Sequence, residues 1–321
     1  MPLGEFEIIA RYFSRTTARD DVLLGVGDDA ALLMPPPGRA LVAATDTLVE
    51  GRHFLPGTPA ASIGHNALAV NLSDLAAMGA DPAWALLSLS LPDADEGWLD
   101  GFARGLHALA SRHGVALVGG DTVSGPRVVT VEVLGFVPPD AALRRAGARP
   151  GDVVFVSGTP GVAAAGLDLL RDGRATFDSD DPRVRRFLYA EPRLALGRAL
   201  RGRATAAMDV SDGLLGDLAK LATASRVGAR LDLEQLPVEP LLAAGHDREQ
   251  AERYVLHGGD DYELLFTLPD DAADARAQEI AAEAQCAIHR IGEIVAAPGV
   301  TCRRCGRDEP VSGRGYDHFA R

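Results

Sequence analysis

Hydrophobic and polar positions follow two spacings along the chain, and each spacing predicts a different element. In the first half, apolar residues recur every three or four positions over about 62–78, which indicates a helix with one face against a core. Short apolar runs that end at glycine, proline or aspartate indicate strands. The helices expected in this half cover 5–13, 62–78 and 98–113, and the strands 40–44, 84–91, 115–118 and 127–137.

The second half repeats the alternation of strands and helices. Its expected strands cover 152–157, 206–210, 230–233, 262–268 and 288–295, and its expected helices 162–170, 213–225 and 270–284. Between the halves, residues 138–151 are rich in proline and glycine, which is typical of a linker. We therefore predict an α/β protein with α+β sandwich layers and two domains: a mixed-sheet N-terminal domain (1–137), the linker (138–151) and a C-terminal α/β domain (152–321).

Length and charge limit the functions to consider. The chain has 321 residues, enough for about two domains. Its 45 acidic and 32 basic side chains give a net charge of −13, which disfavours nonspecific binding to nucleic acid. No apolar run approaches the ~20 residues of a membrane span. The first residues lack the basic and apolar regions of a signal peptide, so we expect no membrane partner and a cytoplasmic location.

The basic residues are almost all arginine: the chain has 31 arginines and one lysine, Lys220. A phosphate-binding P-loop needs a lysine between glycine and serine or threonine, and a protein kinase needs one in a Val-Ala-Ile-Lys strand. Lys220 lies instead in Leu-Ala-Lys-Leu, in what reads as an ordinary helix. Both of these phosphate-binding arrangements are therefore excluded.

Aspartates gather at the predicted ends of strands and helices. Taken singly, each is an ordinary turn or cap residue. Together, clustered carboxylates repel one another, and hard divalent cations such as Mg²⁺ relieve that repulsion. The residues alone therefore predict Mg²⁺-dependent phosphate chemistry without a P-loop. The aspartates concerned are Asp28, Asp29, Asp46, Asp74, Asp121, Asp209, Asp212, Asp260 and Asp261, of which Asp46 and Asp121 are expected just after strands.

Nine short segments occur in the order found in one family. They are Gly-Glu-Phe-Glu from 4, Gly-Asp-Asp-Ala-Ala from 27, Thr-Asp-Thr-Leu-Val-Glu-Gly-Arg-His-Phe from 45, Asn-Leu-Ser-Asp-Leu-Ala-Ala-Met-Gly-Ala from 71, Gly-Gly-Asp-Thr from 119, Arg-Ala-Gly-Ala-Arg-Pro-Gly-Asp from 145, Met-Asp-Val-Ser-Asp-Gly-Leu from 208, Gly-Gly-Asp-Asp-Tyr-Glu-Leu from 258 and Gly-Tyr-Asp-His-Phe from 315. With these segments, which run from residue 4 to residue 319, the chain resembles the thiamine-monophosphate kinases of the aminoimidazole-ribonucleotide-synthetase-like superfamily.

The resemblance implies direct in-line transfer of the γ-phosphoryl group of ATP to thiamine monophosphate, giving thiamine diphosphate. It also implies a homodimer that pairs its N-terminal domains. The ligands it implies for several Mg²⁺ ions are Asp29, Thr45, Asp46, Asp74, Asp121, Asp209 and Asp212, with catalysis depending most on Asp46, Asp74 and Asp212. The implied nucleotide contacts are Gly120, Asp121, Arg145 and Ser211, and the implied contacts to thiamine monophosphate are His53, Asp260 and Tyr316.

Some alternatives stay open. Arg52 beside His53 departs from the usual small apolar residue of the family, Asp260 often stands as Glu, and position 316 is often Trp. Another activity of the superfamily, above all aminoimidazole ribonucleotide synthesis, is a formal possibility, as is a sensing protein without catalysis on the same scaffold. A zinc site is a further possibility, from the spacing of Cys286, His289, Cys302 and Cys305, although 302–305 reads as a surface loop.

Overall fold

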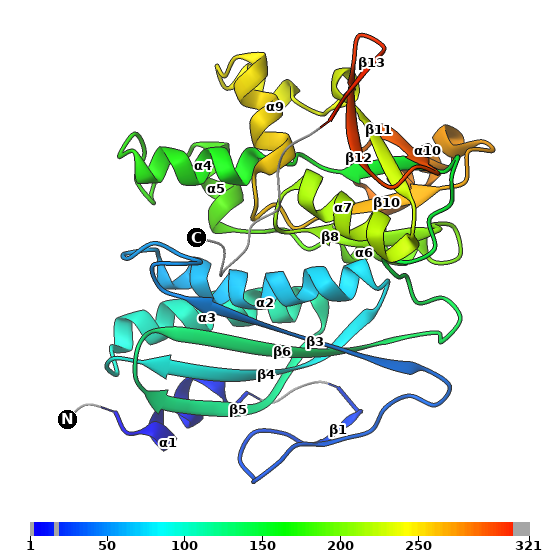
Figure 1. Ribbon diagram of the computed structural model, residues 1–321. Helices are drawn as coiled ribbons and strands as arrows, with labels where there is room; N and C mark the ends of the chain where they lie inside the picture. The colour runs from blue at the N-terminus through cyan, green and yellow to red at the C-terminus, as the bar shows by residue number, and fades with distance from the viewer. Residues whose placement is uncertain (1–2, 16–18, 311–321) are drawn as a thin grey trace. The chain divides into compact units, whose positions relative to one another are not determined.

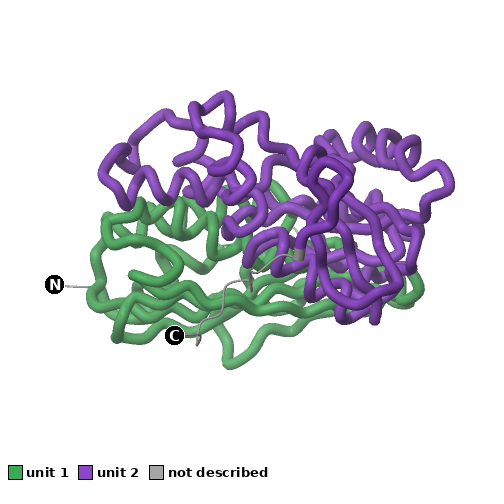
Figure 2. The backbone as a smooth tube through the Cα atoms, turned by 45° about the horizontal axis from the view of Figure 1, so that its top comes forward, with its two compact units in different colours: residues 1–75, 80–140 green, residues 76–79, 141–321 purple. Residues whose placement is uncertain are grey.

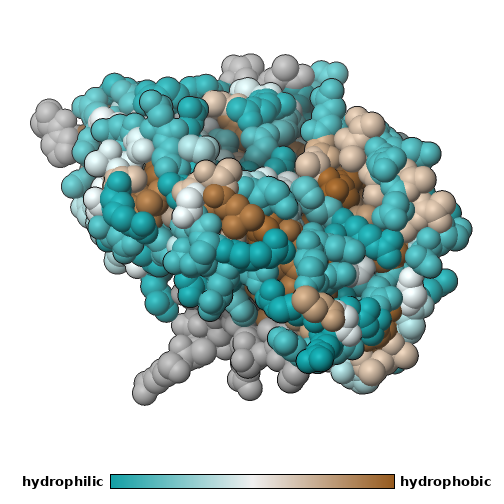
Figure 3. All heavy atoms as spheres, turned by 90° about the horizontal axis from the view of Figure 1, so that it is seen from above, coloured by the Kyte–Doolittle hydropathy of each residue, from teal (hydrophilic) through white to brown (hydrophobic). Residues whose placement is uncertain are grey.

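The computed structural model describes residues 3–15 and 19–310, and the chain forms two compact units (Figure 2). Unit 1 comprises residues 1–75 and 80–140, and unit 2 comprises residues 76–79 and 141–321. Within the described ranges, the model has no helix with the length and apolar character that a membrane crossing requires. On the face drawn in Figure 3, hydrophilic side chains predominate and hydrophobic ones form small separate groups.

Unit 1 is built on a four-stranded mixed sheet with the strand order β3-β6-β4-β5. The β4–β5 pair is parallel and the other pairs are antiparallel. A short antiparallel pair, β1–β2, forms a sheet of its own. The elements are α1 (Glu5–Ile8), the π-helical turn η1 (Ile9–Phe13), β1 (Val22–Leu24), β2 (Leu32–Leu33), β3 (Ala40–Val49), α2 (Ala60–Ala77), β4 (Asp81–Leu91), α3 (Glu96–His113), β5 (Ala116–Ser124) and β6 (Val128–Val137).

Helices α2 and α3 lie together along one face of this sheet (Figure 1). Their backbones touch because glycines stand at the crossing. A Cβ atom at Gly64 would lie 2.1 Å from the carbonyl oxygen of Phe102, and one at Gly105 would lie 1.9 Å from that of Ala61. Leu72 of α2 is fully buried, so the apolar spacing predicted for this helix does face a core.

Unit 2 is built on a seven-stranded sheet with the order β13-β12-β9-β11-β7-β10-β8. Among the described strands of this sheet, only the β12–β9 pair is parallel. Strands β7, β8 and β10 are buried along their whole length, so both of their faces are covered. The elements are β7 (Val153–Ser157), α4 (Val162–Arg171), α5 (Pro182–Leu188), α6 (Leu194–Leu200), β8 (Ala206–Val210), α7 (Leu214–Ser225), β9 (Gly228–Asp232), η2 (Leu233–Gln235), α8 (Glu239–Ala243), α9 (Arg248–His257), β10 (Glu263–Leu268), α10 (Ala273–Ala284), β11 (Ile288–Val295), β12 (Gly299–Arg304) and β13 (Arg307–Pro310).

The predicted fold class is confirmed, but two strands run well past their expected C-terminal ends. Strand β3 continues to Val49 and β5 continues to Ser124, so Asp46 and Asp121 lie within strands and not after them. The prediction of their places was wrong because polar residues were taken to end the strands. The β3–β6 ladder in fact runs on to the pair Val49–Val128, and alternate polar side chains of β3 face solvent.

Candidate active site

The turn between β8 and α7 is held by a buried carboxylate from that helix. Oδ2 of Asp217 accepts the backbone N–H groups of both Ser211 and Asp212 at 3.0 Å. Gly213 completes the turn with a φ of 100°, which favours glycine. Asp217 is fully buried, so the turn that carries two predicted site residues has a fixed backbone.

Lys220 closes a charge cluster at the same turn. Its ammonium group donates to Oδ2 of Asp212 at 2.5 Å and to Oδ1 of Asp217 at 2.8 Å. Burial lowers the pKa of Lys220, but its two carboxylate partners outweigh that effect and raise the pKa overall. The expectation that the chain's one lysine is an ordinary helix residue was wrong. It neutralises a predicted metal ligand.

A second loop, Gly258–Tyr262, packs against this turn and is called here the Asp260 loop. The N–H of Asp260 donates to the carbonyl of Ser211 at 3.0 Å, and the N–H of Tyr262 donates to that of Val210 at 2.8 Å. A Cβ atom at Gly259 would lie 2.7 Å from the same Ser211 oxygen. The contact is therefore between the two backbones. It fixes Asp260, a predicted contact to the substrate, next to Ser211, a predicted contact to the nucleotide.

The carboxyl group of Asp260 is electrostatically coupled to Asp212. Burial is the main cause that raises the pKa of Asp260 to about 6, and the charge of Asp212 adds to the rise. The hydroxyl of Tyr262, 3.4 Å away, and the charge of Arg171 act in the opposite direction. A carboxyl group whose charge is disfavoured in this way, next to a second carboxylate, suits a site that binds a cation.

Two more predicted residues of unit 2 lie next to the same strand. Asp209 is a buried residue of β8, opposite Leu264 of β10 in the sheet register. Arg145 is exposed in the loop before β7, where its carbonyl accepts the hydroxyl of Ser225 at 3.0 Å. The N–H of Ala207 in β8 donates to the carbonyl of the preceding residue, Arg144, at 2.8 Å. The loop of Arg145 is thus attached to the first residues of β8.

The predicted strand residues of unit 1 lie on neighbouring rows of its sheet. Asp46 stands in the row of Val131, Leu87 and Gly120. Asp121 occupies the next row, and a Cβ atom at Gly120 would lie 1.8 Å from the carbonyl oxygen of Leu87. The glycine therefore permits a close backbone contact that no other residue allows. The remaining strand residue of the set, Thr45, donates its hydroxyl to the carbonyl of Val131 at 3.2 Å.

Helix α2 carries a buried polar side chain next to Asp74. Asn71 is fully buried, and its amide nitrogen donates to the carbonyl of Ala67 at 2.9 Å. Its Oδ1 atom has no hydrogen-bond partner among the residues that the structure describes. Asn71 and Asp74 are three residues apart, so they share a helix face. A buried acceptor of this kind suits a ligand, or a water bound to one.

The two remaining predicted residues of unit 1 lie in turns. His53 follows β3, and its Nδ1 atom accepts the N–H of Val49 at 3.0 Å. Asp29 is exposed in the loop between β1 and β2, where its N–H donates to Oδ1 of Asp28 at 2.8 Å. The backbone N–H of Arg52 donates to the carbonyl of Val49, which places Arg52 in the same turn as His53.

Within unit 2 the structure brings Ser211, Asp212 and Asp260 together, and within unit 1 it places Thr45 and Asp46 on β3 one to two rows from Asp121. The six predicted metal-binding aspartates come from both units. Among residues 3–15 and 19–310, no three His, Cys, Asp or Glu side chains are arranged to hold a metal ion. Tyr316 lies outside the described residues.

The cysteines form no zinc site in the part of the chain that the structure describes. All three are free thiols. Cys302 is buried in β12, so the expectation of a surface loop at 302–305 was wrong. Only Cys305 lies in a turn, with a φ of 48° next to Gly306.

Family models and full-length relatives agree on what the chain is similar to. The AIR synthase related protein N-terminal domain matches residues 27–137, and the corresponding C-terminal domain matches residues 149–304. Thiamine-monophosphate kinase of Escherichia coli strain K12 is 46% identical over 327 residues, covering 100% of this chain and 99% of the relative. The chain belongs to the thiamine-monophosphate kinase family.

Solved structures of this family have the same architecture. The thiamine-monophosphate kinase of Stenotrophomonas maltophilia K279a is 46% identical, with a TM-score of 0.86 over 94% of this chain and 97% of that one. AaThiL complexed with AMPPCP and TMP is 32% identical, with a TM-score of 0.78 over 92% of each chain. The hydrogenase maturation protein HypE in complex with ATP is 22% identical with a TM-score of 0.76, a likeness of fold alone.

Proposed function

We propose that this chain transfers the γ-phosphoryl group of ATP to thiamine monophosphate, giving thiamine diphosphate, and that it requires Mg²⁺. The observation that carries the proposal is the 46% identity over the whole chain to a thiamine-monophosphate kinase. A relative at 32% identity complexed with AMPPCP and TMP supports the same two substrates. The packing of the Asp260 loop on the Ser211–Asp212 turn supports a shared site for acceptor and nucleotide in unit 2.

The donor atoms of the predicted site fit Mg²⁺. Carboxylates, a hydroxyl and an amide oxygen are the hard ligands that this ion prefers, and Asn71 offers a buried oxygen without a partner in the described chain. The proposed ligands are Asp29, Thr45, Asp46, Asp74, Asp121, Asp209 and Asp212. When bound, the ions would neutralise phosphate charge and orient the reacting oxygens.

The protein's own groups would mainly hold and orient two anions. The acceptor phosphate is largely ionised near neutral pH, since its second pKa is about 6, so the reaction needs no strong base. His53 accepts a backbone N–H at Nδ1, which orients its ring, and it would contact the acceptor phosphate. Asp260 would lie near the cationic thiazolium, with Tyr316 on the same ligand, while Ser211, Gly120 and Arg145 would bind the nucleotide. Positioning of this kind favours direct in-line transfer.

We further propose a homodimer through the N-terminal domain (1–137). Leu41 and Val123 are about half exposed, at 50% and 49%, on β3 and β5 of the unit 1 sheet. They stand on the two edge strands of the sheet, so a second copy that buried both would cover the sheet from edge to edge. We also propose a cytoplasmic location, which three free cysteines support.

The proposal is tested by following thiamine diphosphate during incubation of the purified chain with thiamine monophosphate, ATP and Mg²⁺. Free thiamine and aminoimidazole ribonucleotide precursors serve as alternative acceptors or substrates in parallel. We expect turnover of thiamine monophosphate alone, and loss of that turnover with EDTA. Turnover of free thiamine at a comparable rate would show that the acceptor is misassigned.

A further inference from the structure

The Asp260 loop has an unusual backbone. Asp260 and Tyr262 both have positive φ values, of 62° and 52°, in the left-handed region that disfavours side chains. Such conformations persist only where the surroundings impose them, and they concentrate at functional sites. The residue between them, Asp261, is fully buried. Whatever holds Asp261 therefore sets the conformation in which Asp260 is presented.

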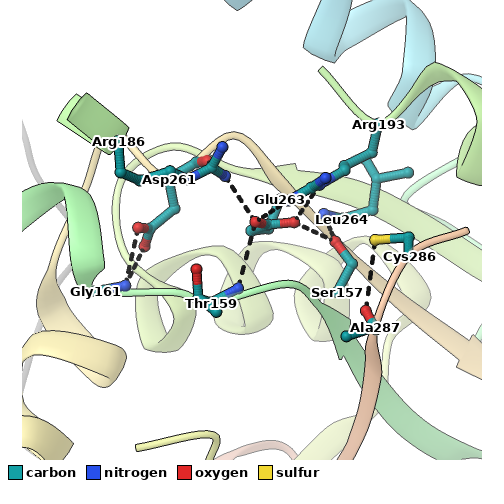
Figure 4. Close-up of polar contacts among 10 residues, drawn as sticks. All are labelled: Ser157, Thr159, Gly161, Arg186, Arg193, Asp261, Glu263, Leu264, Cys286 and Ala287. Atoms are coloured by element: carbon teal, nitrogen blue, oxygen red, sulfur yellow. Dashed lines mark hydrogen bonds and ion pairs between the residues drawn. The ribbon is translucent and has the colours of Figure 1, made fainter. Parts of the chain in front are cut away.

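The side chain of Asp261 is anchored to the start of α4. Both of its carboxylate oxygens accept the N–H of Gly161, each at 2.8 Å (Figure 4). Gly161 itself has a φ of 85°, and a Cβ atom there would lie 2.5 Å from the carbonyl carbon of Tyr254. The carboxylate of Asp261 is therefore attached to a backbone segment that itself packs closely on Tyr254.

The backbone of Asp261 is held by an arginine from a third element. Nη2 of Arg186, on α5, donates to the carbonyl oxygen of Asp261 at 2.6 Å and to Oε1 of Glu263 at 2.6 Å. Figure 4 shows this guanidinium group between the two acidic residues. One side chain thus connects the loop to the first residue of β10.

Glu263 is in turn a fixed anion at the centre of the network. It is fully buried, and it accepts Nε and Nη2 of Arg193 at 2.7 Å each and the hydroxyl of Ser157 at 2.6 Å (Figure 4). Burial alone would raise its pKa, but Arg193 and Arg186 outweigh burial and lower the pKa below its usual value. A buried carboxylate with this many donors holds Arg186 in one place.

We propose that Arg186 is a positioning residue for the acceptor substrate. It holds the carbonyl of Asp261, and through it the left-handed backbone that presents the Asp260 carboxylate to thiamine monophosphate. This inference rests on the proposed function, in which Asp260 contacts that substrate. Arg186 itself is assigned no contact with either substrate.

The experiment compares R186Q and R186K with R185Q, a matched control on the exposed face of the same helix. We measure kcat and the KM values for thiamine monophosphate and ATP. Loss of a charged hydrogen bond predicts a rise in the KM for thiamine monophosphate of about 10- to 100-fold in R186Q. The KM of R186K for thiamine monophosphate should lie between the values for R186Q and the wild type, since lysine keeps the positive charge but lacks the planar guanidinium group. R185Q should have the same kcat and the same two KM values as the wild type.

A double-mutant cycle with D260N separates positioning from general stability. If Arg186 acts through Asp260, R186Q should add little to the KM for thiamine monophosphate once Asp260 is replaced. The inference is overturned if R186Q has its full effect in the D260N background, or if it raises both KM values equally. If R186Q does not fold, the double-mutant cycle of R186K with D260N tests in the same way whether Arg186 acts through Asp260. No turnover by the wild type would instead overturn the proposed function, so the two failures are distinct.

Discussion

Replacement of Asp260 by asparagine should make the folded chain more stable near neutral pH. Burial, with the charge of Asp212, raises the pKa of this carboxyl group from the usual 3.8 to about 6, despite the opposing effects of Tyr262 and Arg171. Because the folded state disfavours the ionised carboxyl group, it is destabilised at every pH at which this group is ionised in the unfolded chain. A rise of about two pKa units corresponds to at most about 3 kcal/mol of unfolding free energy.

The sign follows from proton linkage. Because the folded pKa is raised, the folded state binds the proton more tightly than the unfolded chain does. Asp260 therefore carries no penalty below about pH 3.8, and the penalty grows as the pH rises through about 6. The gain in D260N should be at most about 3 kcal/mol near pH 8 and about half as large near pH 5.

Urea unfolding followed by circular dichroism near pH 8 and pH 5 measures this difference. D180N is the matched control, since Asp180 is an exposed carboxyl group of the same unit, and it should change stability by less than about 0.5 kcal/mol. The KM for thiamine monophosphate should rise in D260N at the same time. The reasoning is refuted if D260N is no more stable than wild type near pH 8, or if its gain does not depend on pH.

Other substitutions test the remaining parts of the site. D46N and D74N should each abolish turnover with an unchanged circular dichroism spectrum, and either variant keeping near wild-type activity at limiting Mg²⁺ would remove the metal assignment. D217A leaves two N–H groups of the Ser211–Asp212 turn without their acceptor, so the free energy of unfolding measured in urea should fall by about 2–5 kcal/mol. In D217N, which keeps an acceptor oxygen, it should fall by less. Equal losses in the two variants would contradict that role. K220M frees Asp212 from its ion pair, so calorimetric titration should show that Mn²⁺ binds about 3- to 10-fold more tightly than to the wild type. Weaker or unchanged binding would contradict the competition between Lys220 and the metal.

Helices with long apolar stripes and strands inside the core were predictable from the sequence. Helix α3 was expected over 98–113 and occupies Glu96–His113, since Asp95 caps its start and a left-handed Gly114 ends it. Strand β8 was expected and found over Ala206–Val210. In both cases the local signal and the tertiary environment favour the same structure.

Elements whose stability comes from distant partners were missed. Helices α5 and α6 are seven residues each, and nothing local to them reveals that Arg186 and Arg193 reach Glu263, about seventy residues away in sequence. Residues 302–305 were read as a surface loop, and the strand that includes 302–304, β12, has its parallel partner β9 far away in sequence. Hydrogen-bond ladders of this kind leave no periodic signal in one strand alone.

The site was predictable only as a set of residue types. The aspartates could be named, but the role of Lys220 could not, because its partner Asp212 lies eight residues earlier and meets it only through the turn before α7. The buried Asn71 oxygen and the left-handed backbone at Asp260 are likewise properties of the folded chain. To predict such features from the sequence, one would have to know which turns pack together in the folded chain.

The proposal that phosphate passes directly from ATP to thiamine monophosphate is tested most directly with γ-labelled ATP. The purified chain is incubated with labelled ATP and Mg²⁺, first without acceptor and then with thiamine monophosphate, and both protein and thiamine diphosphate are counted after quenching. Direct transfer predicts an unlabelled protein at every stage and one labelled thiamine diphosphate for each ATP consumed. Stoichiometric label on the protein that passes to added thiamine monophosphate, and that is lost in H53N, would contradict direct transfer, and unlabelled thiamine compounds would contradict the activity itself.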